Sequence, residues 1–432
     1  MSQDMFIVSA GLKKKIFITI GLGLILFVAG VLIGETGGHH DSAAGHEVVA
    51  EASHGSHEVA EASHSSHDEG SSFVTRIWAN LWINNVYFVG IALIAVFWIA
   101  VQYVAEAGWF TIMKRIPEAM GMYLPIGGVL TILIFIFGGH DIFHWMHDGI
   151  MDPTSDHYDA IIAGKEGYLN FGFFIARIVI YFGLWITFYM LFRKFSQQED
   201  IEGGTKWHTK SFKFSAGFLV VFAVTSSMAP WDWILSIDTH WFSTMFGWYV
   251  FSSWFIAGLA FMLLVAVLLN ENGYLPKLNT SHLHDMGKFV FGFSIFWTYI
   301  WFSQFFLIWY ANVPEEVVYF TYRFQEYKAV LFINLIINFL IPFLGLMTHE
   351  SKRQTFILKV VAVVILVGHY LDFYLMVMPG TVKEHYGFGL VELGTFMTFS
   401  GVFVFIFVNT LSKVKLEPSN HPFIEESNHH DI

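Results

Sequence analysis

The sequence contains no cysteine. Disulfide bonds, thiolate-ligated iron–sulfur clusters and covalently attached c-type haem all require cysteine, so this chain can carry none of them itself. Charge is scarce as well, because Asp, Glu, Lys and Arg make up 13% of the 432 residues, against roughly 25% in an average soluble domain. The formal net charge of −12 argues against binding to nucleic acid, which requires a basic face.

Apolar residues are correspondingly abundant. They make up 55% of the chain, with 47 Phe and 15 Trp, a composition suited to lipid-facing surfaces. Ten apolar runs are long enough to span a bilayer as helices. We expect these spans at about 16–33, 82–105, 122–139, 169–192, 212–229, 247–269, 288–311, 329–347, 356–376 and 391–411. The predicted fold is therefore an all-α polytopic membrane protein.

The basic residues predict the orientation of these spans. If the N-terminus is cytoplasmic, 17 Lys and Arg residues fall on the cytoplasmic side and 5 on the outer side, as the positive-inside rule requires. The residues left on the outer side are Arg76, Lys165, Arg323, Lys328 and Lys383. The expected organisation is a cytoplasmic N-terminus with a retained first helix (1–34), an outer loop (35–81), a core of nine helices (82–411) and a cytoplasmic tail (412–432).

The predicted outer loop is rich in histidine and contains an internal repeat, His46 to His54 followed by His57 to His64. Small, acidic and histidine residues cannot bury a core, so a solvated tether is the favoured interpretation. Imidazoles and carboxylates lie close together along it, which makes metal binding the alternative. The weak candidate ligands are His46, His54, His57 and His64.

Ionisable and polar residues within or beside the spans gather toward the predicted outer side, where we expect a polar cavity. Such residues are costly in lipid and usually mark a function or a paired partner. His369 and Asp372 are three residues apart and share one helix face. The candidates for a proton path are His140, Asp141, His144, Arg177, Asp232, Asp238, His240, Gln304, His369, Asp372 and Glu392.

Structural interpretations of these residues stay open. His369 and Asp372 could form a structural pair, with Arg177 as a partner, or a proton relay. Asp232 and Asp238 could position a short interfacial helix over 231–241, and the Asp141 to His147 segment could be a solvated helix end. In the inner half, Asn334 and Asn338 are expected to hydrogen-bond between helices. Because His369 is the only histidine deep in a predicted span, a haem with two histidine ligands is not expected.

Two stretches of the chain resemble a known family. Residues 232–244 (DWILSIDTHWFST) and 299–316 (YIWFSQFFLIWYANVPEE) are similar to a loop and to a span with its exit loop in the NrfD-like integral membrane subunits of bacterial alternative complex III. The second stretch looks most like the smaller of that complex's two such subunits. The ten-span layout extends the resemblance over nearly the whole chain, apart from the histidine-rich loop and the tail.

The resemblance implies a subunit of a quinol:cytochrome c oxidoreductase in the bacterial cytoplasmic membrane, built on four-helix bundles with flanking helices. In that family the iron–sulfur clusters and haem c lie in partner subunits, and the NrfD-like subunits bind no cofactor of their own. The implied partners are iron–sulfur and multihaem cytochrome c subunits, a larger NrfD-like sister subunit, lipids and, in some assemblies, a terminal oxidase.

Quinol oxidation needs proton acceptors near the quinol hydroxyls. We expect this chain to be a scaffold with a proton-conduit role, and menaquinol or another quinol is a candidate ligand, although the sister subunit is the better candidate for the quinol site. The alternatives are a secondary transporter for divalent metal ions, with the histidine-rich loop gathering the ion, and a purely structural subunit.

Overall fold

The computed structural model describes residues 5–37 and 68–431, and the side chains of 5–34 and 73–431. The described residues form helices and no strand apart from one isolated bridge, between Met5 and Lys415. The candidate ligands His46, His54, His57 and His64 lie outside the described residues.

Ten described segments are long and apolar enough to cross a membrane, which confirms the predicted all-α, multi-pass membrane protein. They are α1 (Ala10–Gly37), α2 (Asp68–Val104), α4 (Leu124–Ile142), α6 (Phe171–Glu202), α7 (Lys206–Trp233), α8 (Phe246–Glu271), α9 (Thr280–Ala311), the segment of α11 (Lys328–Leu335), η5 (Ile336–Leu340) and α12 (Ile341–Gly345), then α13 (Thr355–Thr381) and α14 (Leu390–Leu411). A short helix, α3 (Arg115–Met120), leads into α4.

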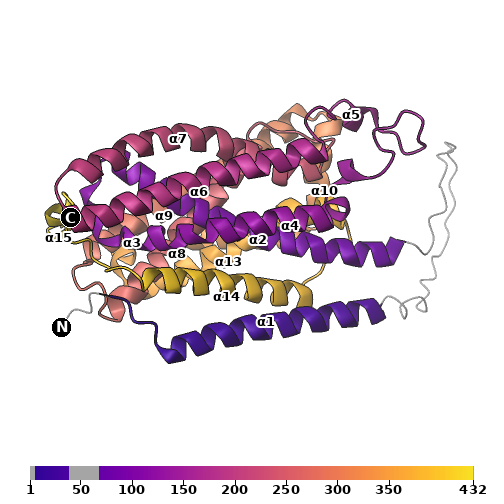
Figure 1. Ribbon diagram of the computed structural model, residues 1–432. Helices are drawn as coiled ribbons and strands as arrows, with labels where there is room; N and C mark the ends of the chain where they lie inside the picture. Colours follow the sequence, from indigo (N-terminus) through magenta and orange to yellow (C-terminus); the bar gives the residue numbers. More distant parts are fainter. Residues whose placement is uncertain (1–4, 38–67, 432) are drawn as a thin grey trace.

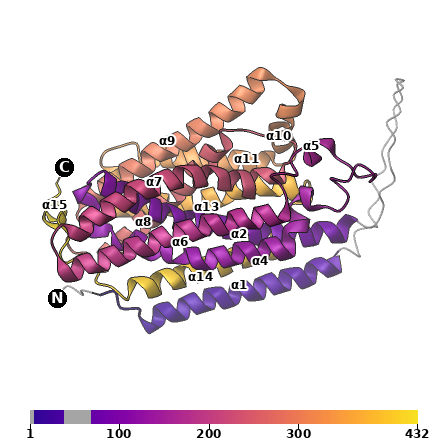
Figure 2. The same ribbon diagram turned by 45° about the horizontal axis from the view of Figure 1, so that its top comes forward.

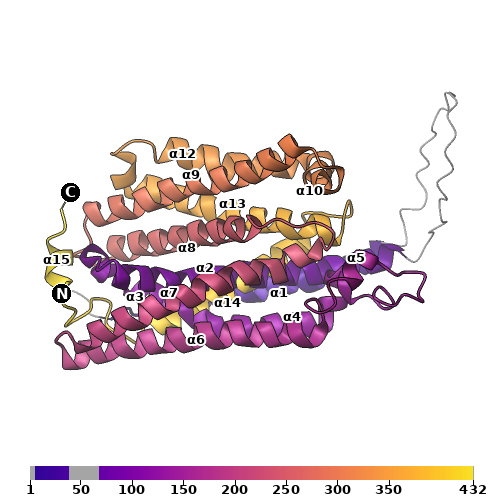
Figure 3. The same ribbon diagram turned by 90° about the horizontal axis from the view of Figure 1, so that it is seen from above.

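Eight of these segments form two four-helix bundles that lie side by side (Figure 3). In the first bundle, α2 packs against α4 and α7, and α6 closes the ring between them. In the second bundle, α8 packs against α9 and α13, and the α11–α12 segment closes the ring. Contacts of α8 with α2 and α7 join the two bundles.

The remaining two helices, α1 and α14, pair along one side of the bundles (Figures 1 and 2). Glycines bring their backbones close together. A Cβ atom added to Gly394 would lie 2.4 Å from the backbone nitrogen of Phe27, and one added to Gly23 would lie 2.9 Å from the carbonyl oxygen of Gly394. Membrane helices associate through such small residues because lipid provides no hydrophobic drive between them.

The connections gather at two opposite ends, which we call the α10 end and the α15 end (Figure 1). The α10 end carries η3 (His144–Met146), α5 (Ala160–Ala163), η4 (Leu235–Ile237) and α10 (Pro314–Gln325), and the α15 end carries η1 (Gly108–Met113), η6 (Ser351–Arg353) and α15 (Ile424–Asn428). The Met5–Lys415 bridge shows that the first and last described segments meet at the α15 end, as an even number of spans requires. The positive-inside rule predicts that this end is cytoplasmic.

Three local predictions differ from the structure. Residues 231–241 do not form a separate interfacial helix, because α7 continues to Trp233 and only the short η4 follows. The outer loop predicted over 35–81 is shorter, because α2 already begins at Asp68. Polar side chains at the start of α2 lower the hydropathy of these first turns, so a hydropathy argument did not include them. Finally, α13 continues past the predicted end at residue 376, through Pro379 to Thr381, which places Asp372 about 13 Å from that end of the helix.

Candidate functional site

A cleft of about 920 Å³ opens at the α10 end between the connections of both bundles. The structure brings together five of the sequence-predicted residues here. His140, Asp141, His144, Asp238 and His240 all line the cleft, together with Glu315, Lys383 and Glu384. The predicted polar cavity therefore exists, and its walls hold groups that accept or donate protons.

The cleft histidines contact one another. The His147 ring lies 4.8 Å from that of His140 and 4.9 Å from that of His144, centroid to centroid. Burial and the neighbouring imidazoles lower the pKa of both His144 and His147. These two imidazoles are therefore neutral at pH 7 and able to accept a proton. Opposite them, Nε2 of His240 lies 2.6 Å from Oδ2 of Asp159.

Arg323 of α10 connects the cleft to the bundle interior. Its guanidinium reaches Asp238 in the cleft at 3.2 Å and donates to the backbone carbonyl oxygens of Tyr319 at 3.0 Å and Leu375 at 3.1 Å. The ring of Tyr319 lies under the guanidinium at 3.4 Å and stacks on Trp241. Although Arg323 belongs to a connection, it is only 4% exposed, so its charge faces the protein and not the solvent.

A small cavity of about 20 Å³ lies behind Arg323. Its lining includes Arg323, Gln304 and Tyr249. The amide nitrogen of Gln304 is buried and has no hydrogen-bond partner among the described residues. A volume of this size accommodates about one water molecule, which could satisfy the Gln304 amide.

Asp372 lies beyond the cavity, at the centre of the second bundle, and is fully buried. Each of the three other members of that bundle donates one hydrogen bond to its carboxylate. Oδ1 accepts from the Tyr249 hydroxyl of α8 at 2.5 Å and from the Asn334 amide of α11 at 2.9 Å. Oδ2 accepts from the Trp297 indole of α9 at 2.9 Å. Side chains of four helices thus converge on one buried carboxylate.

His369 lies one turn further along α13, near the middle of the helix. Its Nδ1 is 2.9 Å from the Ser253 hydroxyl and 3.9 Å from Oδ2 of Asp372. Its Nε2 is buried without a hydrogen-bond partner among the described residues. The polar groups therefore form a discontinuous route from the α10-end cleft through Arg323, the small cavity, Tyr249 and Asp372 to His369.

Three predicted residues lie away from this route, so the expectation of one shared cavity was too broad. Arg177 of α6 forms a two-pronged ion pair with Asp232 of α7, at 2.8 and 3.0 Å, in the first bundle. Arg177 therefore pairs with Asp232 and not with Asp372. Glu392 of α14 pairs with Arg76 of α2 at 2.7 Å. Both pairs tie helices together.

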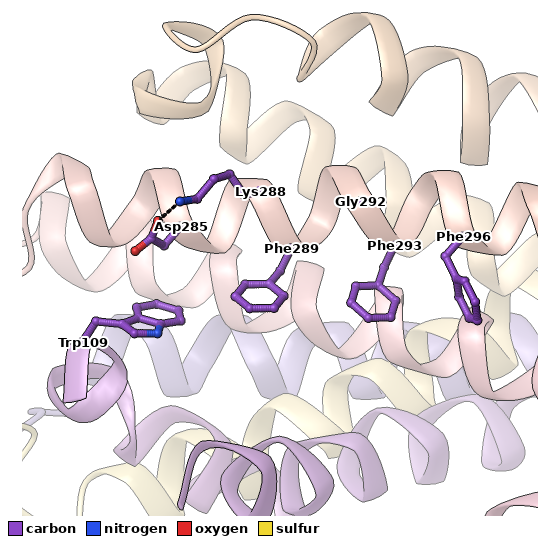
Figure 4. Close-up of a pocket in the computed structure, with 7 residues that line it drawn as sticks. All are labelled: Trp109, Asp285, Lys288, Phe289, Gly292, Phe293 and Phe296. Carbon is purple, nitrogen blue, oxygen red and sulfur yellow. Dashed lines mark ion pairs between the residues drawn. The ribbon is translucent and has the colours of Figure 1, made fainter. Parts of the chain in front are cut away.

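An apolar groove of about 660 Å³ runs along α9 near the α15 end (Figure 4). Phe289, Phe293 and Phe296 project into it from α9, Trp109 closes one end, and an added Cβ at Gly292 would meet nothing within 4 Å. The groove holds one ion pair, between Lys288 and Asp285 at 2.5 Å. Its lining suits a hydrocarbon chain, and it lies far along the bundle from the cleft.

A scan against protein-family models finds no match to this chain, and no curated protein matches it.

Proposed function

We propose that this chain is an integral membrane subunit of a quinol-oxidising respiratory complex of the alternative complex III type, and that its second four-helix bundle transfers protons. Two features support the proposal. One is the resemblance of residues 232–244 and 299–316 to that family. The other is the polar route that joins the α10-end cleft to the middle of the second bundle.

Asp372 is the observation that carries the proton-transfer part of the proposal. It is fully buried, and its two oxygens accept hydrogen bonds from Tyr249, Asn334 and Trp297. No Lys or Arg of the described residues pairs with it, in contrast to Asp232, which pairs with Arg177. A carboxyl group can carry a proton, and the Tyr249 hydroxyl connects this one to the cavity behind Arg323.

The cleft supplies the other end of the proposed route. Neutral His144 and His147 can accept protons released at the α10 end, and Asp238 connects the cleft to Arg323. Electrons would pass through haem c and iron–sulfur clusters in partner subunits, since a chain without cysteine holds neither by thiolate ligation. Quinol would bind mainly in the sister subunit, and this chain would scaffold the complex and conduct protons.

Purification through a tag on this chain tests the assignment to a complex. The chain would be extracted from its native membrane in mild detergent and examined by mass spectrometry and by a reduced-minus-oxidised spectrum. We expect multihaem and iron–sulfur subunits to co-purify, with c-type haem bands. A haem-free preparation containing this chain alone would overturn the assignment.

Substitution of Asp372 tests proton transfer separately. In the purified complex reconstituted into vesicles, Asp372→Asn keeps the side-chain size but cannot ionise, so we expect fewer protons moved per electron while haem content is unchanged. Asp156→Asn, an exposed carboxylate in the connection between α4 and α6, is the matched control and should behave as wild type. An unchanged proton-to-electron ratio in Asp372→Asn would rule out Asp372 as a proton carrier.

The alternative of divalent-metal transport is less well supported by the geometry. A transporter needs ligands that face one another near the middle of the membrane. At that depth both oxygens of Asp372 already accept hydrogen bonds. The arrangement therefore favours protons over metal ions.

A further inference from the structure

Three buried residues with metal-binding side chains meet at the α15 end, far from the polar route. Glu199 comes from the last turns of α6, His208 from the first turns of α7, and His421 from the tail that follows α14. Their ligand atoms all lie within 4.8 Å of one another. The closest approaches are 3.9 Å, between Nδ1 of His208 and Oε1 of Glu199, and between Nε2 of His421 and Oε2 of Glu199.

Several polar atoms of this cluster lack hydrogen-bond partners. Neither ring nitrogen of His208 has one among the described residues, and neither does Oε1 of Glu199, although these atoms are buried. Beside them lies a cavity of about 20 Å³, lined among others by His208, His421 and Gln102, whose amide oxygen is also buried without a partner. Buried polar atoms in proteins are normally satisfied, and an unsatisfied group calls for an unplaced water or ion.

The charged side chains around these residues nearly balance one another. Lys114 donates to Oε2 of Glu199 at 2.7 Å, which leaves Oε1 free. Arg115 contacts Glu118 and Asp200. The cluster therefore contains two cationic and three anionic side chains, and an added divalent ion would change its formal charge only from −1 to +1.

We propose that Glu199, His208 and His421 bind a divalent transition-metal ion, with zinc as the best fit. Two imidazoles and one carboxylate are a common ligand set for zinc, and the fourth position would go to a water or to the Gln102 amide oxygen. Tetrahedral zinc places its ligands roughly 3.4 Å apart, so the side chains need to move inward by about half an ångström. His421 would bind through Nε2, which lies 3.9 Å from Oε2 of Glu199. Its Nδ1 would then give up the hydrogen bond that it accepts from the backbone N–H of Phe423 at 3.2 Å, and would donate to the Thr111 hydroxyl at 3.4 Å.

The ion would fasten the C-terminal tail to the first bundle. His421 is the only one of the three ligands that lies outside the helices, and α15 behind it packs on η1. The tail already donates hydrogen bonds to Asp200 from Ser419 and Asn420. A bound metal would add a link that a chelator can remove, which makes the position of the tail dependent on the ion.

The test uses the full chain with a histidine-free tag, in a background where the seven histidines between residues 39 and 67 are replaced by alanine. This background removes metal binding by the histidine-rich segment. After treatment with EDTA, Zn²⁺ is added and bound metal is counted by mass spectrometry, and Co²⁺ is used to record a tetrahedral absorption spectrum. Proteolysis of the tail is followed with and without Zn²⁺.

We expect one Zn²⁺ per chain, an intense Co²⁺ spectrum, and cleavage of the tail slowed at least tenfold by Zn²⁺. His208→Gln and His421→Gln should each lose the ion and the protection, whereas His429→Gln, an exposed histidine of the same tail, should keep both. If a variant fails to fold, the measurements on the unsubstituted chain still decide. Absence of bound Zn²⁺ there, or cleavage that is indifferent to Zn²⁺, would overturn the proposal.

Discussion

The hydroxyl of Tyr249 lies 2.5 Å from Oδ1 of Asp372, and the same tyrosine lines the small cavity behind Arg323. Tyr249 therefore touches both the buried carboxylate and the space that leads to the cleft. A hydroxyl both accepts and donates a proton, so this residue can connect a water in the cavity with Asp372.

Replacing Tyr249 by phenylalanine tests this connection. Tyr249→Phe keeps the ring but removes the hydroxyl, so Oδ1 of Asp372 retains only the Asn334 amide. We expect a stability loss of about 1 kcal/mol, measured as a lower melting temperature in detergent, and slower proton transfer in the reconstituted complex. Tyr299→Phe, an exposed tyrosine of α9, is the control. Wild-type proton transfer in Tyr249→Phe would mean that protons bypass this hydroxyl.

The Arg177–Asp232 pair is expected to behave as a structural element. Removing one partner of a buried ion pair leaves the other charge without compensation, which typically costs about 3–5 kcal/mol. Arg177→Ala and Asp232→Ala should each lower the melting temperature strongly, and the double variant should lose less than the sum. Arg177→Lys should not restore stability, because lysine cannot make the two parallel bonds to Asp232. Strictly additive losses would contradict a direct pair.

Close packing of α1 on α14 makes Gly394 sensitive to any side chain. In Gly394→Ala, the new Cβ would lie 2.4 Å from the backbone nitrogen of Phe27 and 2.7 Å from the carbonyl oxygen of Gly23. Backbone atoms cannot move aside as side chains do, so α1 should separate from α14. In the control Gly21→Ala, on α1, the new Cβ meets nothing within 4 Å, so this change should be tolerated. The measurement is disulfide crosslinking between cysteines introduced on α1 and α14. The crosslink should form in the wild-type background and in Gly21→Ala, and should not form in Gly394→Ala.

The cleft histidines predict a stability that falls in acid. The pKa values of His144 and His147 are lowered in the folded protein, so below about pH 6.5, the usual value for histidine, the unfolded chain binds more protons than the folded one. The free energy of unfolding must then decrease as the pH falls through this window. Melting temperatures between pH 7.5 and 5 should show a weaker decrease for His144→Asn/His147→Asn than for wild type. The control His429→Asn should follow wild type, and equal slopes in all three proteins would contradict the prediction.

Hydropathy was sufficient to predict the ten membrane segments, because crossing lipid demands long apolar helices whatever the packing between them. It could not predict where α2 begins, because the first turns of this helix are polar. Further along α2, the side chain of Asn80 hydrogen-bonds to Glu392 of α14 at 2.9 Å, a contact that exists only once both helices are in place. The helix α13 also extends beyond its predicted span, through Pro379 to Thr381.

The candidate site was predicted in its residue types but not in its pairing. Five of the predicted residues do line one cleft, because the connections that carry them all lie at the α10 end. The spacing of these residues along the chain could not predict that Arg177 pairs with Asp232 and not with Asp372. Arg323 was counted only as a loop charge, and Tyr249 and Trp297 carried no signal, since aromatic residues are abundant throughout the chain. The cluster at Glu199 escaped notice because its members come from three separate segments.

The pairing of α1 with α14 has a consequence for biosynthesis. The main partner of the first described helix is α14, the last membrane span, so α1 must wait in the membrane until α14 has been synthesised. During that time its glycine face is exposed to lipid or to other proteins. The contact between α1 and α14 therefore forms only after α14 has been inserted, later than the insertion of any early helix. Truncation of the chain before α14 would leave α1 without this partner, even if both bundles had formed.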